Sequence, residues 1–512
     1  MQDNIRHPLM VQPYTRLSDQ QIELIHNGSM QILGNPGLTC FNEQAADYYD
    51  KAGCPVKRET GNMDAWSVRI PQKVIEKYVK TVPGQIKLGA RNPENTLILD
   101  AQKPHVYFGT GSETNIVLHS ELQEFVNKSD PSNSILRPVF REERGSLKNL
   151  CRSAKLCNQL DNLDFFIRNV NIQDKEITLE NKDVNVFLGA LMYMTKHVQA
   201  GLVNIDQLDS VLKMAEIIAG GPDEFRNNPI ISFITCVIKS PLQMVADTTD
   251  KLIAVAEKGC PVVISSSPQG GSTAPIQEEG IVSLINAEIL AGITLAQIVN
   301  PGTPVLYGAV PVRARLDNLH DLYGAPEFIH YNVDCIQMAR HYGIPCYSSA
   351  GVGDAKVPGM QATVEKLFAQ LQVAQAGPQY IHYAFGLLDK TNIFSPLQAV
   401  LDNAHIGFVK QVLRQPQFDQ KNIERMITEI QHTTTSSTKL FARYIRKARR
   451  EGKVSRPYPF ETTEAKDEVM VKAQQQLEEI MSGPEKKPDE TCLETVFKII
   501  PGLLGKDKFM IH

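Results

Sequence analysis

Residues 262–309 contain one complete strand–helix–strand unit. It consists of VVISS at 262–266, EEGIVSLINAEILAGITLAQIV at 278–299 and VLYGA at 305–309. The two short apolar runs are typical of buried strands, because they end in small or polar residues that suit an open strand terminus. The long stretch between them predicts a helix. Such a unit is typical of a parallel sheet whose strands are connected by helices.

The same alternation continues on both sides of this unit. The apolar runs are VYFGT at 106–110, FFIRN at 165–169, VQAGL at 198–202, ISFIT at 231–235, VVISS at 262–266, VLYGA at 305–309, CYSSA at 346–350 and IHYAF at 381–385. Eight βα units in series predict an α/β protein with a TIM (β/α)8 barrel. A doubly wound open sheet is the alternative, which the count of eight disfavours. The long first connection, 111–164, must hold an insertion as well as a helix.

The flanking segments differ from this pattern. We predict an N-terminal part of helices and a β-hairpin at 1–100, the barrel at 101–415, a C-terminal helical extension at 416–481, and a linker with a terminal tail at 482–512. Ser18 or Asp19 is a suitable N-cap for the first helix, and QIKLGARNPENTLILD at 85–100 is typical of a hairpin. The tail is expected to dock on the body or on a second subunit.

Composition and charge exclude little but set a context. The net charge of −4 provides no strong field for nucleic acid or an anionic membrane, and no partner of either kind is expected. The nine cysteines are scattered without a CxxC pair, which indicates a reducing compartment and no metal site. The first residues lack the apolar core of a signal peptide, and no apolar run of about 18 residues is present for a membrane span. We therefore expect a cytoplasmic protein.

In a barrel, the functional site lies at the C-terminal ends of the strands. Five aromatic residues fall near these ends: Phe108, Tyr307, Tyr347, Tyr383 and Phe385. Each ring alone would be interpreted as packing. Together they predict a cage for a cation, because ring faces attract a quaternary ammonium group by about 0.5–2 kcal/mol each.

The segment PQGGSTAP, at 268–275, follows one of the strands and has two interpretations. Its backbone N–H groups can cradle an anion, although it lacks the lysine of a phosphate loop. Glycine is also the default turn residue, so a turn without a ligand is the other interpretation. His382 on its own is equally typical of a core or rim histidine.

Five segments taken together resemble a known family. They are FGTGSET at 108–114, SSSPQGGSTAPI at 265–276, NPGTPVLYG at 300–308, GVGDAKVPGMQATVEK at 351–366 and YIHYAFGLLD at 380–389. Their order and spacing resemble the trimethylamine methyltransferase superfamily of TIM-barrel, corrinoid-dependent methyltransferases, from about residue 15 to about residue 480. Founding members carry pyrrolysine in the barrel. This sequence contains no non-standard residue and is similar to the non-pyrrolysine branch, which acts on quaternary amines such as glycine betaine.

The resemblance implies transfer of a methyl group from a quaternary amine to the cob(I)alamin of a separate small corrinoid protein. This chain would bind no corrinoid tightly and would need no catalytic nucleophile, since cobalt(I) fills that role; a homo-oligomer is expected. The substrate-binding set is Phe108, Glu113, Gln269, Ser272, Thr273, Tyr307, Tyr347, Lys356, His382, Tyr383 and Phe385. Within it, residues 269–273 and Lys356 would bind a substrate carboxylate, and Glu113 would face the ammonium. The rival functions are a barrel enzyme acting on an anionic metabolite and a non-catalytic betaine-binding protein.

Overall fold

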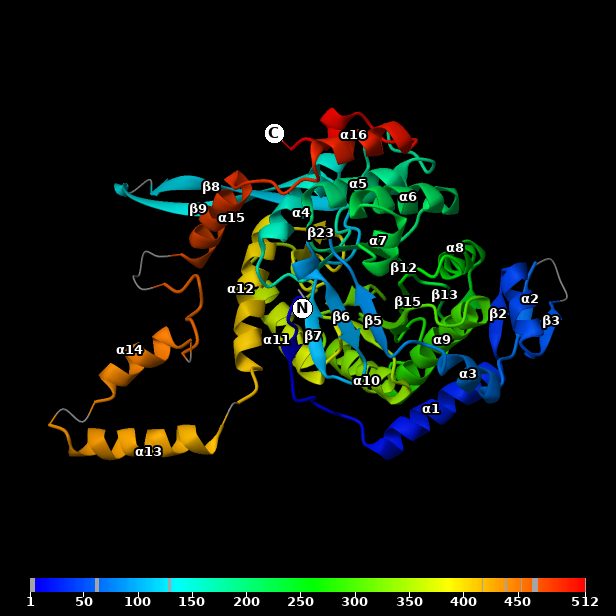
Figure 1. The fold of residues 1–512 in the computed structure, drawn as a ribbon, viewed down its shortest axis with the longest axis horizontal. Coiled ribbons are helices and arrows are strands. Elements are labelled where there is room, and N and C mark those ends of the chain that lie inside the picture. The colour runs from blue at the N-terminus through cyan, green and yellow to red at the C-terminus, as the bar shows by residue number, and fades with distance from the viewer. Residues whose placement is uncertain are drawn as a thin grey trace.

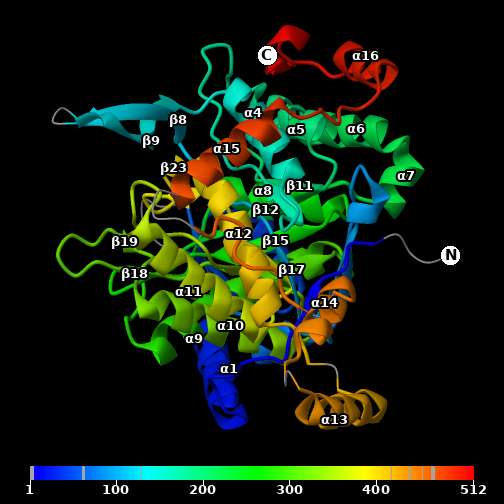
Figure 2. The same cartoon turned by 90° about the vertical axis from the view of Figure 1, so that its left-hand side faces the viewer.

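The computed structural model describes residues 5–59, 64–127, 130–416, 418–437, 440–452, 454–462 and 468–511. Its centre is a nine-stranded, curled and mostly parallel sheet with helices around it (Figures 1 and 2). The parallel strands are β7 (His105–Phe108), β10 (Phe165–Ile167), β11 (His197–Ala200), β12 (Ile231–Thr235), β15 (Val262–Ser266), β17 (Val305–Ala309), β20 (Cys346–Ser349) and β21 (Tyr380–His382). Each predicted apolar run forms one of these strands.

Helices follow the strands in the predicted alternation. They are α4 (Leu147–Gln159), α5 (Lys182–Tyr193), α6 (Leu208–Ala219), α7 (Pro222–Asn227), α8 (Ala246–Glu257), α9 (Glu278–Val299), α10 (Pro326–Tyr342), α11 (Met360–Ala376) and α12 (Pro396–Val412). In the described part of the chain, α9 alone is long and apolar enough to cross a membrane. Of its most apolar window, 89% is buried in the fold, as in the core helix of a globular protein.

The two ends of the sheet order approach each other at a seam between β7 and β10. The short strand β1 (Leu9–Met10) pairs antiparallel with the first half of β7. Beyond it, Gly109 forms an isolated parallel bridge with Phe165, and the Asp164 N–H donates to the Phe108 carbonyl at 2.7 Å. The N-terminal segment therefore fills one half of the seam, and β10 meets β7 in the other.

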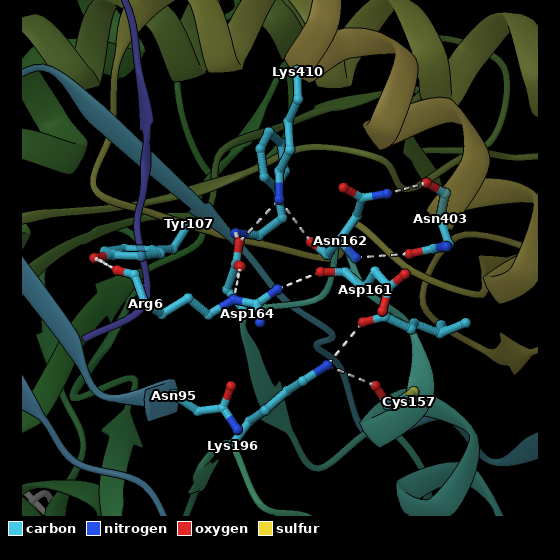
Figure 3. Close-up of polar contacts among 12 residues, drawn as sticks. Arg6, Asn95, Tyr107, Cys157, Asp161, Asn162, Asp164, Lys196, Asn403 and Lys410 are labelled. Carbon is cyan, nitrogen blue, oxygen red and sulfur yellow. Dashed lines mark hydrogen bonds and ion pairs between the residues drawn. The ribbon is translucent and has the colours of Figure 1, made fainter. Parts of the chain in front are cut away.

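Charged side chains reinforce this seam, as Figure 3 shows. The carboxylate of Asp164 accepts the backbone N–H of Phe108 at 2.8 Å and forms an ion pair with Arg6. Lys410 of α12 brings its Nζ to 3.6 Å from the same carboxylate. One buried carboxylate thus connects the N-terminal segment, helix α12 and the strand seam.

A second buried amine lies beside the same seam (Figure 3). Lys196 donates from Nζ to the carbonyls of Leu160, at 2.8 Å, and Cys157, at 3.3 Å. These carbonyls are at the C-terminal end of α4, where helix carbonyls lack partners and favour a cation. Burial lowers the pKa of Lys196 to about 7. No cavity among those described reaches this amine, so we assign it to the fold and not to a site.

Successive strand residues alternate between two cores. The inner core lies inside the curled sheet and contains Tyr107, Phe165, Ile167, Val263, Leu306, Tyr347 and Tyr380. The predicted hairpin, β5 (Gln85–Leu88) and β6 (Leu97–Asp100), adds apolar residues to this core and so closes one end of it. The outer core lies between the strands and the surrounding helices, and it contains Phe108, Tyr307 and Phe385.

The N-terminal helices form where the sequence predicts them. They are α1 (Asp19–Gly34), α2 (Glu43–Lys51) and α3 (Gln72–Val79), and Ser18 caps α1 through a capping box with Gln21. A five-stranded sheet combines β2 (Leu38–Cys40), β3 (Val56–Arg58) and β4 (Trp66–Val68) with β13 (Ile238–Lys239) and β14 (Gln243–Met244). The N-terminal part is therefore attached to the loop that follows β12.

The long first connection holds an insertion as well as a helix, as predicted, and the insertion is a hairpin. The hairpin, β8 (Ile116–Asn127) and β9 (Asp130–Arg144), projects from the body in Figure 1, and α4 follows it. β8 also pairs with the short strand β23 (Ile393–Phe394), which in turn pairs with β22 (Leu387–Leu388). A small sheet of β16 (Gln269–Gly270), β18 (Val312–Ala314) and β19 (Asp321–Leu322) lies over the ends of β15 and β17.

The C-terminal extension is helical. It contains α13 (Gln420–Thr435), α14 (Ala442–Arg450), α15 (Val469–Ser482) and α16 (Glu490–Ile499). The tail docks on the body of its own chain, because Tyr193 of α5 donates its hydroxyl to the Phe509 carbonyl at 2.8 Å. Asn185 of the same helix donates to the Gly502 carbonyl at 2.9 Å.

Candidate functional site

A small cavity lies at the C-terminal ends of the central strands. Its volume is about 170 Å³, and its lining comes from residues within or directly after β7, β10, β11, β12, β20 and β21. The lining residues are Ser112, Glu113, Ile167, Arg168, Ala200, Gly201, Ile234, Tyr347 and Tyr383. Drug-sized ligands occupy roughly 300–1,000 Å³. This cavity therefore suits a substrate of few heavy atoms.

Larger hollows occur away from these strand ends. One of about 640 Å³ lies at the opposite ends of the strands, beside Ile86 and Pro261. Another, of about 580 Å³, is an apolar groove between α11, α12 and α15. The smaller cavity is the better candidate site, because it alone among these three lies where the strand-end loops converge.

An aromatic stack forms one side of the candidate site. The ring of His382 lies 4.0 Å from that of Tyr347, at an interplanar angle of 20°, and 3.7 Å from that of Tyr383. Burial lowers the pKa of His382 well below its usual value and raises the pKa of Tyr347 well above its own. Burial also raises the pKa of Tyr383. All three rings are therefore neutral at physiological pH.

Hydrogen bonding and a glycine fix this stack. His382 Nε2 lies 2.6 Å from the Ser349 hydroxyl. A Cβ on Gly111 would lie 2.7 Å from Cδ1 of Tyr383 and 3.0 Å from Nδ1 of His382. Only glycine leaves room for the two rings at this distance, which gives the FGTGSET segment a specific role.

Two residues of the cavity adopt left-handed backbone conformations that side chains disfavour. Ser112 has a φ of +63° and Tyr383 a φ of +67°. Such conformations cost on the order of 1–3 kcal/mol each and concentrate at functional sites. Tyr383 directly follows the inward-facing His382, and strand alternation would turn it outward. Its unusual φ accompanies its place in the cavity lining.

The cavity also contains a compact group of charges. Glu113 forms an ion pair with Nη2 of Arg168, and its other oxygen lies 3.0 Å from Nζ of Lys182. Two cations therefore already compensate this carboxylate. Glu113 is one of the predicted site residues, whereas Arg168 is not among them; Arg168 lies one residue beyond strand β10 in the FFIRN run. Its position directly after a predicted strand is the feature of the sequence that could have identified Arg168 as a site residue.

The structure places three predicted cage aromatics away from the cavity. Phe108 faces the outer core, where Nζ of Lys410 lies 5.5 Å from its ring. Tyr307 also faces outward and donates its hydroxyl to Asn286 of α9 at 2.9 Å. Phe385 belongs to the same outer core. Of the five cage aromatics, Tyr347 and Tyr383 come together at the cavity, and the ring of His382 packs against both.

The PQGGSTAP segment forms a closed turn. The Gln269 N–H donates to the Thr273 hydroxyl at 2.9 Å, and the Ser272 and Ala274 N–H groups both donate to the Gln269 carbonyl. Its amides thus satisfy one another, which supports the turn interpretation over an anion cradle. Lys356 is exposed on the loop after β20. None of Gln269, Ser272, Thr273 and Lys356 lines the cavity.

Among the described residues, no three His, Cys, Asp or Glu side chains lie close enough together to bind a metal ion. Cys236 lines a separate cavity of about 110 Å³ after β12, and its sulfur is 2.7 Å from the Ser265 hydroxyl. Burial raises the pKa of this thiol, although part of the residue is exposed. Because a raised pKa favours the protonated form, the thiol is not activated as a nucleophile.

A known protein family matches most of the sequence. The model of the trimethylamine methyltransferase (MTTB) family matches residues 2–436. The chain therefore belongs to the trimethylamine methyltransferase family, a family of methyltransferase enzymes.

Individual relatives indicate two kinds of substrate. The chain is 28% identical to the trimethylamine methyltransferase MttB of Desulfitobacterium hafniense (strain DSM 10664 / DCB-2), over 77% of this chain and 74% of the relative. It is 26% identical to the glycine betaine methyltransferase of D. hafniense (strain Y51), over 80% and 79%. It is also 28% identical to MttB of Methanosarcina thermophila, over 77% of both chains.

Proposed function

We propose that this protein transfers a methyl group from a small quaternary amine, glycine betaine or a similar compound, to the cob(I)alamin of a separate corrinoid protein. The observation that carries the proposal is the neutral wall of Tyr347, His382 and Tyr383 beside a small cavity at the strand ends. A quaternary ammonium has no N–H to donate, so it is recognised by ring faces and shape. Similarity to a glycine betaine methyltransferase supports the same substrate class.

The proposal includes a closed (β/α)8 barrel with the site at its mouth. The parallel bridge between Gly109 and Phe165 and the hydrogen bond from Asp164 to Phe108 support closure at the seam. The hairpin β5–β6 blocks the opposite end of the inner core. Substrate and corrinoid partner would therefore both approach the strand-end face.

The reaction breaks one N–CH3 bond, and the bonding electron pair stays on nitrogen, so a neutral tertiary amine leaves. The corrinoid of the partner supplies the cobalt(I) nucleophile that accepts the methyl group. No proton is transferred in this step, and accordingly Tyr347, Tyr383 and His382 need only remain neutral. Their work is to hold the ammonium, orient one methyl toward the mouth and exclude water.

The surroundings of the site follow from the same proposal. The small corrinoid protein would dock over the strand-end loops, and the corrinoid would stay with that partner. We further propose that the enzyme belongs to the non-pyrrolysine branch and works as a homo-oligomer in the cytoplasm.

A direct assay tests this function. The purified protein is incubated with cob(I)alamin and, separately, with glycine betaine, other quaternary amines and trimethylamine, and methylation of the corrinoid is followed by its absorption spectrum. Methylation with at least one quaternary amine, and release of the matching tertiary amine, is expected. Methylation with trimethylamine alone would refute the substrate class, and binding of glycine betaine without any methylation would favour a non-catalytic binding protein.

A further inference from the structure

One nitrogen of the Arg168 guanidinium has no hydrogen-bond partner among the described residues. Its side chain is 9% exposed, and its backbone N–H donates to the Gln199 carbonyl at 3.0 Å, which fixes its place at the end of β10. Nη2 is ion-paired with Glu113, whereas the buried Nη1 has no hydrogen-bond partner among the described residues. A buried donor without a partner is costly, and a guanidinium has its strongest interactions with carboxylates.

The charges around Arg168 favour an anion. Arg168 and Lys182 together face the single carboxylate of Glu113, which leaves one excess positive charge in this group. Asp183, the next carboxylate, accepts the backbone N–H groups of Val203 at 2.9 Å and Asn204 at 2.8 Å. Burial raises the pKa of Asp183, and the charges of Arg168 and Lys251 oppose that shift.

The same cavity therefore presents two unlike surfaces. Tyr347 and Tyr383 contribute neutral ring surface to the lining, and Arg168 contributes a guanidinium whose buried Nη1 has no hydrogen-bond partner among the described residues. These features are complementary to the two ends of a zwitterion, an ammonium without N–H groups and a carboxylate. The segments that the sequence analysis assigned to the carboxylate lie outside the cavity, so they do not compete for this role.

We propose that Arg168 binds the carboxylate of the substrate and thereby selects carboxylated quaternary amines over amines without an anionic group. This inference rests on the proposed function and names its specificity residue. Glu113 acts as a positioning residue that holds the guanidinium through Nη2, and it does not serve as the counterion of the ammonium.

The test compares two ligands with the same cationic head. Glycine betaine carries a carboxylate and tetramethylammonium does not, and both are titrated by calorimetry into the wild type, Arg168→Gln and Arg168→Lys. Arg168→Gln is expected to weaken glycine betaine binding about 10- to 100-fold more than tetramethylammonium binding, in line with loss of a charge-assisted hydrogen bond. Arg168→Lys should lie between, because it keeps the charge but not the fork of donors. An equal loss for both ligands, or no loss, would overturn the assignment.

Two further variants separate specificity from folding and from the role of Glu113. Arg313→Gln removes another partly buried, ion-paired arginine, 3.4 Å from Glu327 and outside the cavity, and it should not change the ratio of the two affinities. Glu113→Gln keeps a side-chain oxygen that can accept from Nη2 but removes the negative charge that competes for Arg168, so it should shift that ratio toward glycine betaine. A similar loss for both ligands in Glu113→Gln would make Glu113 the ammonium counterion and would refute the proposal.

The outcome is distinguishable from a failure of the proposed function. Methyl transfer to cob(I)alamin is measured on the same wild-type preparation with both amines. If neither amine is demethylated, the methyltransferase assignment fails, while the binding ratio still reports on Arg168. If tetramethylammonium is demethylated at a higher kcat/KM than glycine betaine, the function stands and the carboxylate selection is wrong. Should Arg168→Gln not fold, Arg168→Lys provides the same comparison.

Discussion

A fully buried ion pair connects the loops of the candidate site, and breaking it is predicted to destabilise the protein. Lys366 of α11 and Asp402 of α12 are both 0% exposed, with 3.2 Å between Nζ and the carboxylate. Lys366 also donates to the Leu387 carbonyl at 3.0 Å, and Asp402 accepts the Gly386 N–H at 2.7 Å. Burial lowers the pKa of Lys366, and Asp402 opposes that shift.

The size of the effect follows from the burial of both partners. Removing one member of a buried pair leaves the other charge uncompensated and costs about 3–5 kcal/mol. Lys366→Met should therefore lower the free energy of unfolding by this amount. With an unfolding entropy of about 2.1 cal/mol/K per residue over 512 residues, Tm should fall by about 3–5 °C if the chain unfolds as one unit.

Urea unfolding followed by circular dichroism, with calorimetry for Tm, measures this loss. The control is the double variant Lys366→Met with Asp402→Leu, which replaces the pair by apolar groups. It should be less destabilised than the sum of the two single variants, because no buried charge remains unpaired. A loss below about 1 kcal/mol in Lys366→Met, or strict additivity in the double variant, would show that the pair does not hold these loops together.

Three further predictions concern the seam and the cavity. The folded-state pKa of Lys196 is lowered to about 7, so above that pH the unfolded chain binds more protons than the folded chain. The free energy of unfolding of the wild type should therefore rise by about 2 kcal/mol relative to that of Lys196→Met between pH 7 and 9. Parallel stability–pH curves for the two proteins would contradict this. Gly111→Ala places a Cβ 2.7 Å from Tyr383 and should weaken glycine betaine binding at least tenfold with little change in Tm, and unaltered affinity would refute the tight fit. Tyr347→Ala should weaken binding of tetramethylammonium more than Phe385→Ala does, since only Tyr347 lines the cavity, and the reverse order in calorimetry would restore the predicted cage at Phe385.

Much of the fold was predictable because its signals are local. Buried parallel strands require short apolar runs, so the runs beginning at Val106 and Val262 identify strands without any tertiary information. The cap at Ser18 and the polar turn of the hairpin are equally local. Strand β1 was missed because two residues carry no periodicity, and it forms only where the seam provides a partner.

The site was harder to predict because it depends on orientation. In a strand, a shift of one residue moves a side chain to the other face, and for this reason Phe108 and Tyr307 lie in the outer core while Tyr107 and Leu306 lie inside. The place of Tyr383 depends on a backbone conformation that sequence does not reveal. Finding Arg168 requires knowing which strand-end loops meet.

The position of bound glycine betaine tests the central claim most directly. In a crystal structure of the protein grown with this compound, we predict the trimethylammonium group against the rings of Tyr347 and Tyr383, with one methyl directed toward the mouth. The carboxylate should lie within hydrogen-bond distance of Arg168. Glycine betaine bound only outside this cavity, or bound with its carboxylate against the rings and its ammonium beside Arg168, would contradict the account.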